Sequence, residues 1–191
     1  MTYFDNPNIN DWHQQIITGT VLGGSSLVKP AKGKNCYLFM RSSDQQWLKY
    51  KAAELNNLAS QRPFTYEQST ARWHSNCFPI FTQLYNRFYP DKKKIVTMEI
   101  LDSLRDIGLA IWYGDCGKLK GNTALLNTNK FGEKGTKLMS NYFSEAGIGK
   151  ADVVREKNYF RLNLDEQASN KFFLIVANHL PEFMQKQLLP K

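Results

Sequence analysis

The spacing of apolar and polar residues predicts a regular order of helices and β-strands. Apolar residues that recur every three or four positions predict helices over residues 12–23, 45–58, 79–89, 99–104, 107–116, 133–146 and 166–178, with a short tail helix from 181. Partial alternation around turn residues predicts β-hairpins over 25–41, 64–76 and 153–164, and a strand over 122–127 after a short basic strand. Asp11, Asp44 and Asp165 each stand where a helix N-cap is expected.

The predicted elements form an internal duplication. The order helix, strands, helix, strands, helix occurs twice, although the two copies differ in residue identity. We therefore expect an α+β chain of two halves, residues 1–95 and 96–191, with a basic linker at 90–95 that belongs to the first half. Helices packed on one face of antiparallel strands would leave the other strand face in solvent.

The segment 107–129 is the most unusual stretch of the chain. Residues 109–114 are uncharged and are followed directly by Asp115-Cys116-Gly117. An aspartate at the C-terminal end of a helix is electrostatically unfavourable, because the last carbonyl groups carry the negative end of the helix dipole. A cation near Asp115 would explain the position. A turn opened by Asp115 and Gly117 would explain it as well.

Small residues lie four positions apart in two of the predicted helices. Gly19 and Gly23 share a face of the first helix, and Ala110 and Gly114 share a face of the central helix. Glycine inside a helix is costly, so a pair on one face indicates that another backbone comes close. We expect these two helices to cross tightly through Gly19, Gly23, Ala110 and Gly114. The alternative is that Gly23 is only a C-terminal cap.

Composition indicates an intracellular protein with a polyanionic partner. The chain has 191 residues, 25 Lys and Arg against 17 Asp and Glu, and a formal net charge of +8. The three cysteines contain no CxxC pair, which argues against a zinc knuckle or a disulfide framework. No signal peptide or membrane span is recognisable, so we expect a soluble protein in the cytoplasm, nucleoid or an organelle.

The basic excess is concentrated in the first half and in the hairpins. Residues 1–95 carry 12 Lys and Arg and 6 acids (12 − 6 = +6), whereas residues 96–191 carry 13 and 11 (13 − 11 = +2). A basic strand face suits nucleic acid, since the major groove admits a β-ribbon. The alternative is a solvated basic face on an ordinary α+β enzyme. The predicted DNA contacts are Lys29, Lys32, Lys34, Arg41, Arg72, His74, Lys118, Lys120, Arg155, Lys157 and Arg161.

Several motifs resemble the single-chain LAGLIDADG homing endonucleases, in order along nearly the whole chain. Residues 109–117 (LAIWYGDCG) resemble that family's second motif, L-A-x-W-[FY]-x-D-D-G, and residues 124–131 (ALLNTNKF) resemble the run that follows it. Residues 19–27 (GTVLGGSSL) resemble the first motif, G-x-L-L-G-D-A-x-[ILV]. Residues 84–89 with Lys93 and Lys94 fit the region between the repeats, and 180–188 fit the end of the family's chains.

This resemblance implies a fold and a reaction. It implies two αββαββα halves related by a pseudo-twofold axis, with crossed motif helices and two antiparallel sheets that form a saddle over double-stranded DNA. It also implies one acidic residue at the foot of each motif helix, which together hold the Mg²⁺ or Mn²⁺ ions that activate water for cleavage. Because one chain supplies both halves, we expect a monomer.

The chain departs from the family at both acidic positions. In this alignment the first acid falls on Gly24 and the second on Cys116, and neither offers an oxygen side chain for Mg²⁺. Asp115 stands one residue early, which turns a helical side chain by about 100°. The remaining candidates are Asp115 and the Gly24 carbonyl for metal, and Asp115, Lys94 and Lys118 for catalysis.

Three functions stay open on this basis. The first is a site-specific DNA endonuclease, including a nickase or degenerate form that uses Mg²⁺ or Mn²⁺. The second is a DNA-binding regulator that has lost cleavage, and the third is an RNA-binding intron maturase on the same fold. Metal-dependent strand scission separates the first from the other two, and affinity for duplex DNA or structured RNA separates the second from the third. No membrane partner is expected.

Overall fold

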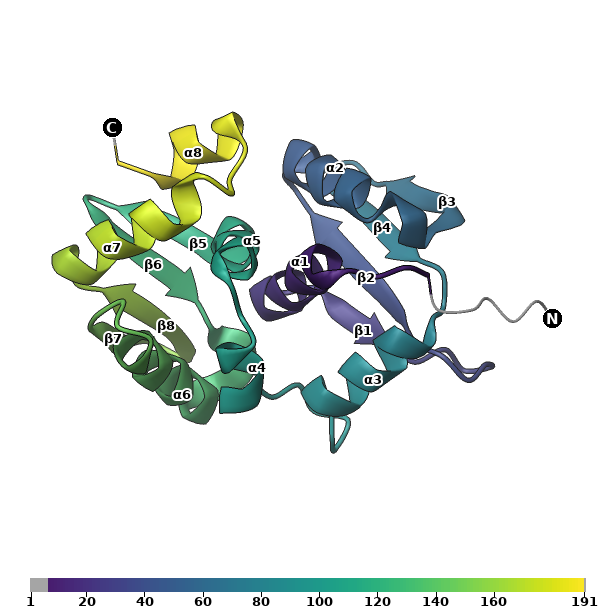
Figure 1. Cartoon of the computed structure of the whole chain (residues 1–191), viewed down its shortest axis with the longest axis horizontal. Coiled ribbons are helices and arrows are strands. Elements are labelled where there is room, and N and C mark those ends of the chain that lie inside the picture. Colours follow the sequence, from purple (N-terminus) through teal and green to yellow (C-terminus); the bar gives the residue numbers. More distant parts are fainter. Residues whose placement is uncertain (1–6, 191) are drawn as a thin grey trace. The chain divides into compact units, whose positions relative to one another are not determined.

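The computed structural model describes residues 7–190 as an α+β chain with two four-stranded antiparallel sheets (Figure 1). The described residues divide into two compact units. The first unit holds the residues up to Ile17 together with Ser25–Lys93, and the second holds Thr18–Gly24 together with the residues from Lys94 onward. The first helix therefore contributes its last turns to the second unit, while the predicted boundary stands at 95/96.

The first unit contains the earlier sheet, with strand order β1-β2-β4-β3. Its elements are α1 (Asp11–Gly23, whose end belongs to the second unit), β1 (Ser26–Val28), β2 (Tyr37–Ser42), α2 (Gln45–Glu54), a 3₁₀ turn (Asn56–Leu58), β3 (Ala59–Tyr66), β4 (Ala71–Ser75) and α3 (Pro79–Phe88). Asp44 caps α2, since its side chain accepts a hydrogen bond of 2.9 Å from the Trp47 backbone N–H.

Alternation along the strands assigns each side chain of this sheet to a face. In β4, Ala71, Trp73 and Ser75 are buried beneath the helices, while Arg72 and His74 are only half-buried on the opposite face. Helices α2 and α3 contact strands of the sheet. One face is thus the core of the unit, and the other carries the polar side chains.

The second unit repeats this plan, with strand order β5-β6-β8-β7. Its elements are α4 (Met98–Asp102), α5 (Asp106–Cys116), β5 (Gly117–Lys120), β6 (Thr123–Asn127), a 3₁₀ turn (Asn129–Phe131), α6 (Gly132–Glu145), β7 (Ala151–Glu156), β8 (Tyr159–Leu164), α7 (Glu166–Ala177) and α8 (Glu182–Leu188). Both sheets pair their four strands in the same order, so the predicted α+β duplication is confirmed.

Helix α5 is the core of the second unit. Every residue from Ile107 to Tyr113 is buried, which explains why this helix has no polar face. The Tyr113 ring meets the Phe172 ring of α7 edge to face, with 5.2 Å between the ring centroids. The ring centroids of Trp112 and Phe143 of α6 lie 5.9 Å apart. The Tyr113 hydroxyl donates a hydrogen bond of 3.0 Å to the Leu188 carbonyl. These contacts fix the end of α5 where the candidate site begins.

The structure corrects several details of the sequence interpretation. Asn10, not Asp11, takes the N-cap position of the first helix, since its side chain accepts a hydrogen bond of 3.0 Å from the His13 backbone N–H. Asp115 and Gly117 do not form a turn, because α5 continues through Asp115 and Gly117 is already the first residue of β5, with φ −80° and ψ 161°. A Cβ on Gly117 would lie 2.1 Å from the Tyr113 ring, so close packing requires this glycine. The predicted helix 45–58 ends at Glu54, and the strand predicted from residue 64 begins at Ala59.

Two further expectations concern cysteine and membranes. Cys36, Cys77 and Cys116 are free thiols, in agreement with the absence of a disulfide framework. Within residues 7–190, the helices are too short or too polar to cross a lipid bilayer.

Candidate nucleic-acid interface

The last turns of α1 pack against α5 at very short range inside the second unit. A Cβ on Gly19 would lie 2.4 Å from the Gly108 carbonyl oxygen, and one on Gly23 would lie 2.2 Å from the Asp115 Cβ. Both glycines therefore stand where another chain segment comes close, as their spacing suggested. The atoms of α5 nearest to Gly19 and Gly23 belong to Gly108, Ile111, Trp112 and Asp115, whereas the sequence pointed to Ala110 and Gly114.

Two lysine side chains bind the carbonyl groups at the C-terminal end of α1. The Lys94 Nζ donates a hydrogen bond to the Val21 carbonyl, and the Lys130 Nζ donates one to the Gly24 carbonyl. Gly24 ends the helix with φ +139°, a conformation that favours glycine. The negative end of the helix dipole thus faces two amino groups that come from 73 and 106 residues away in the sequence.

Burial shifts the pKa of two groups at this helix end. It lowers the pKa of Lys94 to about 7, assisted by the nearby charge of Lys130 and opposed by Cys116 and Asp115. It raises the pKa of Cys116 to about 12, and the charge of Asp115 acts in the same direction. The Cys116 thiol donates a hydrogen bond of 3.3 Å to the Trp112 carbonyl. Cys116 is therefore a neutral thiol at physiological pH, not a thiolate ligand.

A cavity of about 420 Å³ lies beside these helix ends in the second unit. Its lining contains one acid, Asp115, and three basic residues, Lys118, Lys130 and Arg161. Asparagine amides and a tyrosine also line it, from Asn127, Asn129 and Tyr159. A concave site with excess positive charge and amide donors suits a phosphate group better than a cation.

The residues at this site do not fit the divalent metal that the sequence resemblance implies. Within residues 7–190, His, Cys, Asp and Glu side chains form no group of three or more that could hold a metal ion. Position 24 has no side chain and its carbonyl accepts a hydrogen bond from Lys130, while Cys116 stays protonated. Asp115 is the one carboxylate among the lining residues, and a hard cation such as Mg²⁺ needs more oxygen ligands.

The open face of the second sheet continues from this cavity. Lys118 of β5 lies opposite Leu125 of β6, and Asn127 lies opposite Arg161 of β8. An ion pair of 2.6 Å between Arg161 and Glu156 holds the guanidinium group at the sheet surface. Lys120 is exposed at the end of β5. Basic and amide side chains thus form adjacent positions on one strand surface.

Arg155 and Lys157 do not share this face. Arg155 lies opposite Phe160 across the two strands, and its guanidinium group lies 5.8 Å from the centre of the Phe160 ring. Phe160 is the neighbour of Arg161 in β8, so Arg155 and Arg161 point to opposite faces of the sheet. The pKa of Glu133, at the start of α6, is lowered first by Lys137 and in smaller part by Arg155. Arg155 therefore points toward the helical side. Lys157 occupies the hairpin turn with φ +55°.

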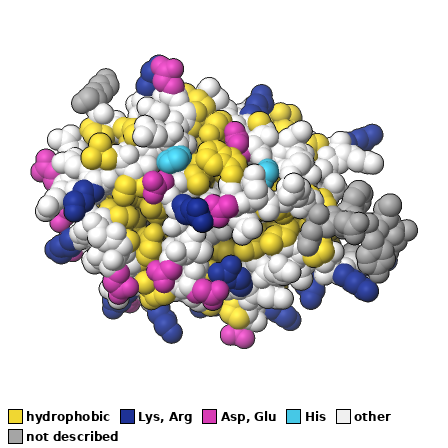
Figure 2. All heavy atoms as spheres, viewed as in Figure 1, with side chains coloured by type: hydrophobic (Ala, Val, Ile, Leu, Met, Phe, Trp, Pro, Cys, Tyr) yellow, Lys and Arg dark blue, Asp and Glu magenta, His cyan; other side chains and the backbone are white. Residues whose placement is uncertain are grey.

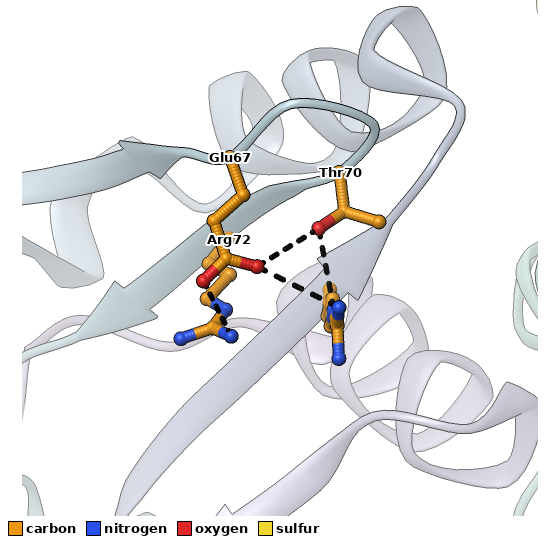
Figure 3. A network of polar contacts seen from close by, with 4 residues as sticks. Glu67, Thr70 and Arg72 are labelled. Carbon is orange, nitrogen blue, oxygen red and sulfur yellow. Dashed lines mark hydrogen bonds and ion pairs between the residues drawn. The ribbon is translucent and has the colours of Figure 1, made fainter.

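The open face of the first sheet carries a compact polar network (Figure 3). Arg41 and Arg72 are direct neighbours across β2 and β4, and Thr65 of β3 lies next in the same row. Glu67 joins both arginines, with N–O distances of 2.6 Å to Arg72 and 3.6 Å to Arg41. Thr70 accepts from the Arg41 Nε and donates to Glu67. One carboxylate therefore orients two guanidinium groups on the same surface.

Aromatic side chains adjoin this network on the same face. Tyr37 and Phe39 alternate with buried residues of β2, and Phe39 lies opposite His74 of β4. The rings of Tyr37 and His74 meet edge to face at 6.2 Å. His74 is a strand residue, as expected. Lys29, Lys32 and Lys34 are exposed in the loop between β1 and β2.

Charge is not segregated on the face that Figure 2 shows. Lysine and arginine side chains are interspersed there with aspartate and glutamate. We therefore consider the net positive charge through local groups of basic residues, such as those on the open sheet faces. Sequence reasoning missed several residues of these groups, among them Lys130, Glu67, Phe39 and Asn127. Lys130 lies inside the quoted run 124–131, so its place after the central motif was the available signal.

Comparison with known proteins places these features in a family context. A family model described as the LAGLIDADG DNA endonuclease family matches residues 14–172. The probable intron-encoded DNA endonuclease 3 of Mycosarcoma maydis is 30% identical over 115 residues, which cover 56% of this chain and 85% of that protein.

Solved structures show the same fold at low sequence identity. The homing endonuclease I-WcaI bound to its DNA recognition sequence superposes with a TM-score of 0.87 at 17% identity, over 99% of this chain and 89% of that chain. I-DmoI in complex with DNA and Mn gives a TM-score of 0.60 at 12% identity, over 89% and 99%. The N-terminal LAGLIDADG domain of DUF199/WhiA gives 0.55 at 10% identity, over 89% and 83%.

Proposed function

Because this chain belongs to the LAGLIDADG DNA endonuclease family, we propose that it recognises a specific double-stranded DNA sequence with the open faces of its two β-sheets. The observation that carries this proposal is the register of basic and polar side chains on those faces, Arg41 beside Arg72 in one sheet and Asn127 beside Arg161 in the other. Two adjacent strands present such side chains at the spacing of a β-ribbon, which the major groove admits.

Each sheet contributes a different kind of contact. Arginine held in a fixed orientation binds guanine through two hydrogen bonds, and asparagine binds adenine in the same way. Lysine acts mainly on phosphate and contributes affinity for any sequence. The Glu67 network therefore favours base recognition by the first sheet. Lys118, which lines the cavity, and Lys120, exposed at the end of β5, favour phosphate contact by the second sheet. Lys29, Lys32 and Lys34 add phosphate contacts from their loop.

A separate question is whether the chain also cleaves the DNA that it binds. An active form would use Mg²⁺ or Mn²⁺ with Asp115 as the metal-binding acid and Lys118 beside the phosphate. Lys94, the other predicted catalytic lysine, is largely buried and bound to the Val21 carbonyl, and it is not among the residues that line the cavity. The neutral thiol at Cys116 and the lysine on the Gly24 carbonyl weigh against ordinary two-metal cleavage. We therefore propose retained DNA recognition with strand scission reduced to nicking or lost. Since one chain contains both duplicated units, the expected active species is a monomer.

Structured RNA is the second candidate partner. The aromatic side chains Tyr37 and Phe39, next to His74 on a half-exposed strand surface, favour it, since unpaired RNA bases stack on such side chains. An intron maturase would use this surface. Duplex DNA remains the first choice, because arginine pairs and lysines outnumber the aromatic residues on the two faces.

The test begins with selection of a binding site from a random duplex library. The selected site is then placed in a supercoiled plasmid and incubated with Mg²⁺ or Mn²⁺. Specific binding with the plasmid left supercoiled supports recognition without cleavage. Nicked or linear product that disappears in Asp115→Asn identifies an active nuclease. Absence of specific duplex binding at low salt, with binding to a structured RNA, would replace this proposal by the maturase function.

A further inference from the structure

The C-terminal end of α1 raises a question of charge. Asp115 lies close against Gly23, beside carbonyl groups that already carry the negative end of a helix dipole. Such an arrangement needs a positive charge nearby. The structure provides two candidates at this point, the amino groups of Lys94 and Lys130, each hydrogen-bonded to one carbonyl of the helix end.

We propose that Lys94 and Lys130 replace a divalent cation at the end of α1, so that this chain binds its DNA without a divalent metal at this position. The inference rests on the proposed DNA recognition and specifies how the site contacts phosphate. It differs from a simple loss of ligands, because the two amino groups bind the Val21 and Gly24 carbonyl groups at the helix end.

The geometry at Gly24 is the first argument. A Cβ at this position would lie 3.0 Å from the Lys130 Nζ, closer than ordinary packing allows. The backbone at Gly24, with φ +139°, is also strained for any residue with a side chain. An aspartate at position 24 would therefore require the Lys130 side chain to move and the backbone to adopt a strained conformation. The glycine at position 24 thus leaves the space in which the Lys130 amino group binds the Gly24 carbonyl.

The placement of Lys94 is the second argument. Its amino group is largely buried, lies 5.4 Å from the centre of the Phe131 ring, and donates to the Val21 carbonyl. A divalent ion at the helix end would meet the charged amino group of Lys130 and the amino group of Lys94, which is charged in only part of the molecules near pH 7, with Asp115 as the one carboxylate among the cavity's lining residues. Both lysines gain hydrogen bonds here that an incoming ion would have to break.

The consequence for DNA is direct contact. The cavity beside the helix end is lined by Lys118, Lys130 and Arg161, which can neutralise a phosphate without a bridging ion. Binding should then depend strongly on monovalent salt and hardly on Mg²⁺ at constant ionic strength.

Two measurements test the inference separately from the proposed function. The first is Mn²⁺ binding to the protein without DNA. The loss of the electron paramagnetic resonance signal of free Mn²⁺ measures this binding. The second is the Kd for the selected duplex in EDTA and in Mg²⁺ at matched ionic strength. Lys130→Glu changes an exposed residue and places a carboxylate beside Asp115. Lys134→Glu, on the exposed surface of α6, makes the same charge change elsewhere.

We expect the natural chain and Lys134→Glu to show no Mn²⁺ binding at millimolar concentration, so that their Kd lies above this range. The Kd of Lys130→Glu for Mn²⁺ should be at least tenfold lower than that limit. The Kd for DNA should change less than twofold between EDTA and Mg²⁺. One Mn²⁺ bound by the natural chain and lost in Asp115→Asn would overturn the inference. So would equal gains in both glutamate variants, or a folded Lys130→Glu without a gain. Failure to bind any duplex would count against the proposed function alone, since the Mn²⁺ result needs no DNA.

Discussion

The two sheets have the same strand order but carry different chemistry on their open faces. In the first sheet, Arg41 and Arg72 are held by Glu67 next to a group of aromatic side chains. In the second, Lys118 and Arg161 line a cavity beside the ends of α1 and α5. The core positions have kept their apolar character, whereas the open faces have diverged. Duplication thus constrains the fold and leaves recognition free to differ between the two units.

The largest expected effect concerns the helix packing that only the second unit uses. Gly19→Leu should lower the free energy of unfolding by about 3 kcal/mol or more, because its side chain would meet the backbone of α5. Urea denaturation measures this change. Gly121→Asn is the control, since Gly121 has φ +58° and open space around it, which asparagine tolerates. Equal destabilisation by both variants would contradict the close packing at Gly19.

A pH effect should also be specific to the second unit. Because burial lowers the pKa of Lys94 from its ordinary value of 10.5 to about 7, the unfolded chain binds more protons between these values. The stability that Lys94 contributes should therefore rise from about pH 7 to 9, and fall as pH decreases, by about a kcal/mol or more; above about pH 9 the raised pKa of Cys116 acts in the opposite direction. The rise between about pH 7 and 9 should be smaller in Lys94→Met than in Lys93→Met. An unchanged slope in Lys94→Met would refute the assignment.

Recognition by the two faces should separate in binding measurements. Arg72→Ala should cost about 1–3 kcal/mol on the selected site and relax the preference at one base pair. Lys118→Ala should weaken binding to all sequences alike and reduce the salt dependence by about one phosphate contact. Repeating the selection and the salt titration with each variant measures both. The reverse pattern would exchange the roles of the two sheets.

The smallest expected effect concerns Glu67. Glu67→Gln removes a negative charge near the DNA, so affinity for random duplex should rise about twofold, while discrimination at the position read by Arg72 falls. Glu133→Gln, on the surface of α6, serves as the matched control and should leave the base preference unchanged. An unaltered selection profile for Glu67→Gln would show that the arginines need no orienting carboxylate.

Local patterns predicted the family, the fold class and most element boundaries. The motif at 109–117 identified the family that the comparisons confirm, and Asp44 and Asp165 cap their helices as expected, because a cap depends on neighbouring residues only. The face of Arg155 was also predictable. A turn at Lys157-Asn158 pairs residue 155 with Phe160, so alternation alone separates Arg155 from Arg161.

The helix-end site could not be predicted in the same way. Lys94 and Lys130 reach the end of α1 across 73 and 106 residues, and no local pattern encodes such contacts. The position of Asp115 was compatible with a nearby cation or with a turn, and sequence could not tell a metal ion from an ammonium group. The turn expected at Gly117 was wrong. This position needs glycine because any side chain would collide with the ring of Tyr113, four residues earlier.

Helix α1 also has a consequence for how the chain is made. Its last turns pack on Gly108, Ile111 and Asp115, which leave the ribosome much later than Gly19. At typical rates of synthesis the interval is roughly 5–20 s. During this time the apolar residues Val21 and Leu22, which are buried in the finished protein, lack the rest of the unit to which they belong. A chaperone that holds nascent chains would find its binding segment here, so the yield of folded protein should depend on translation speed across residues 24–115.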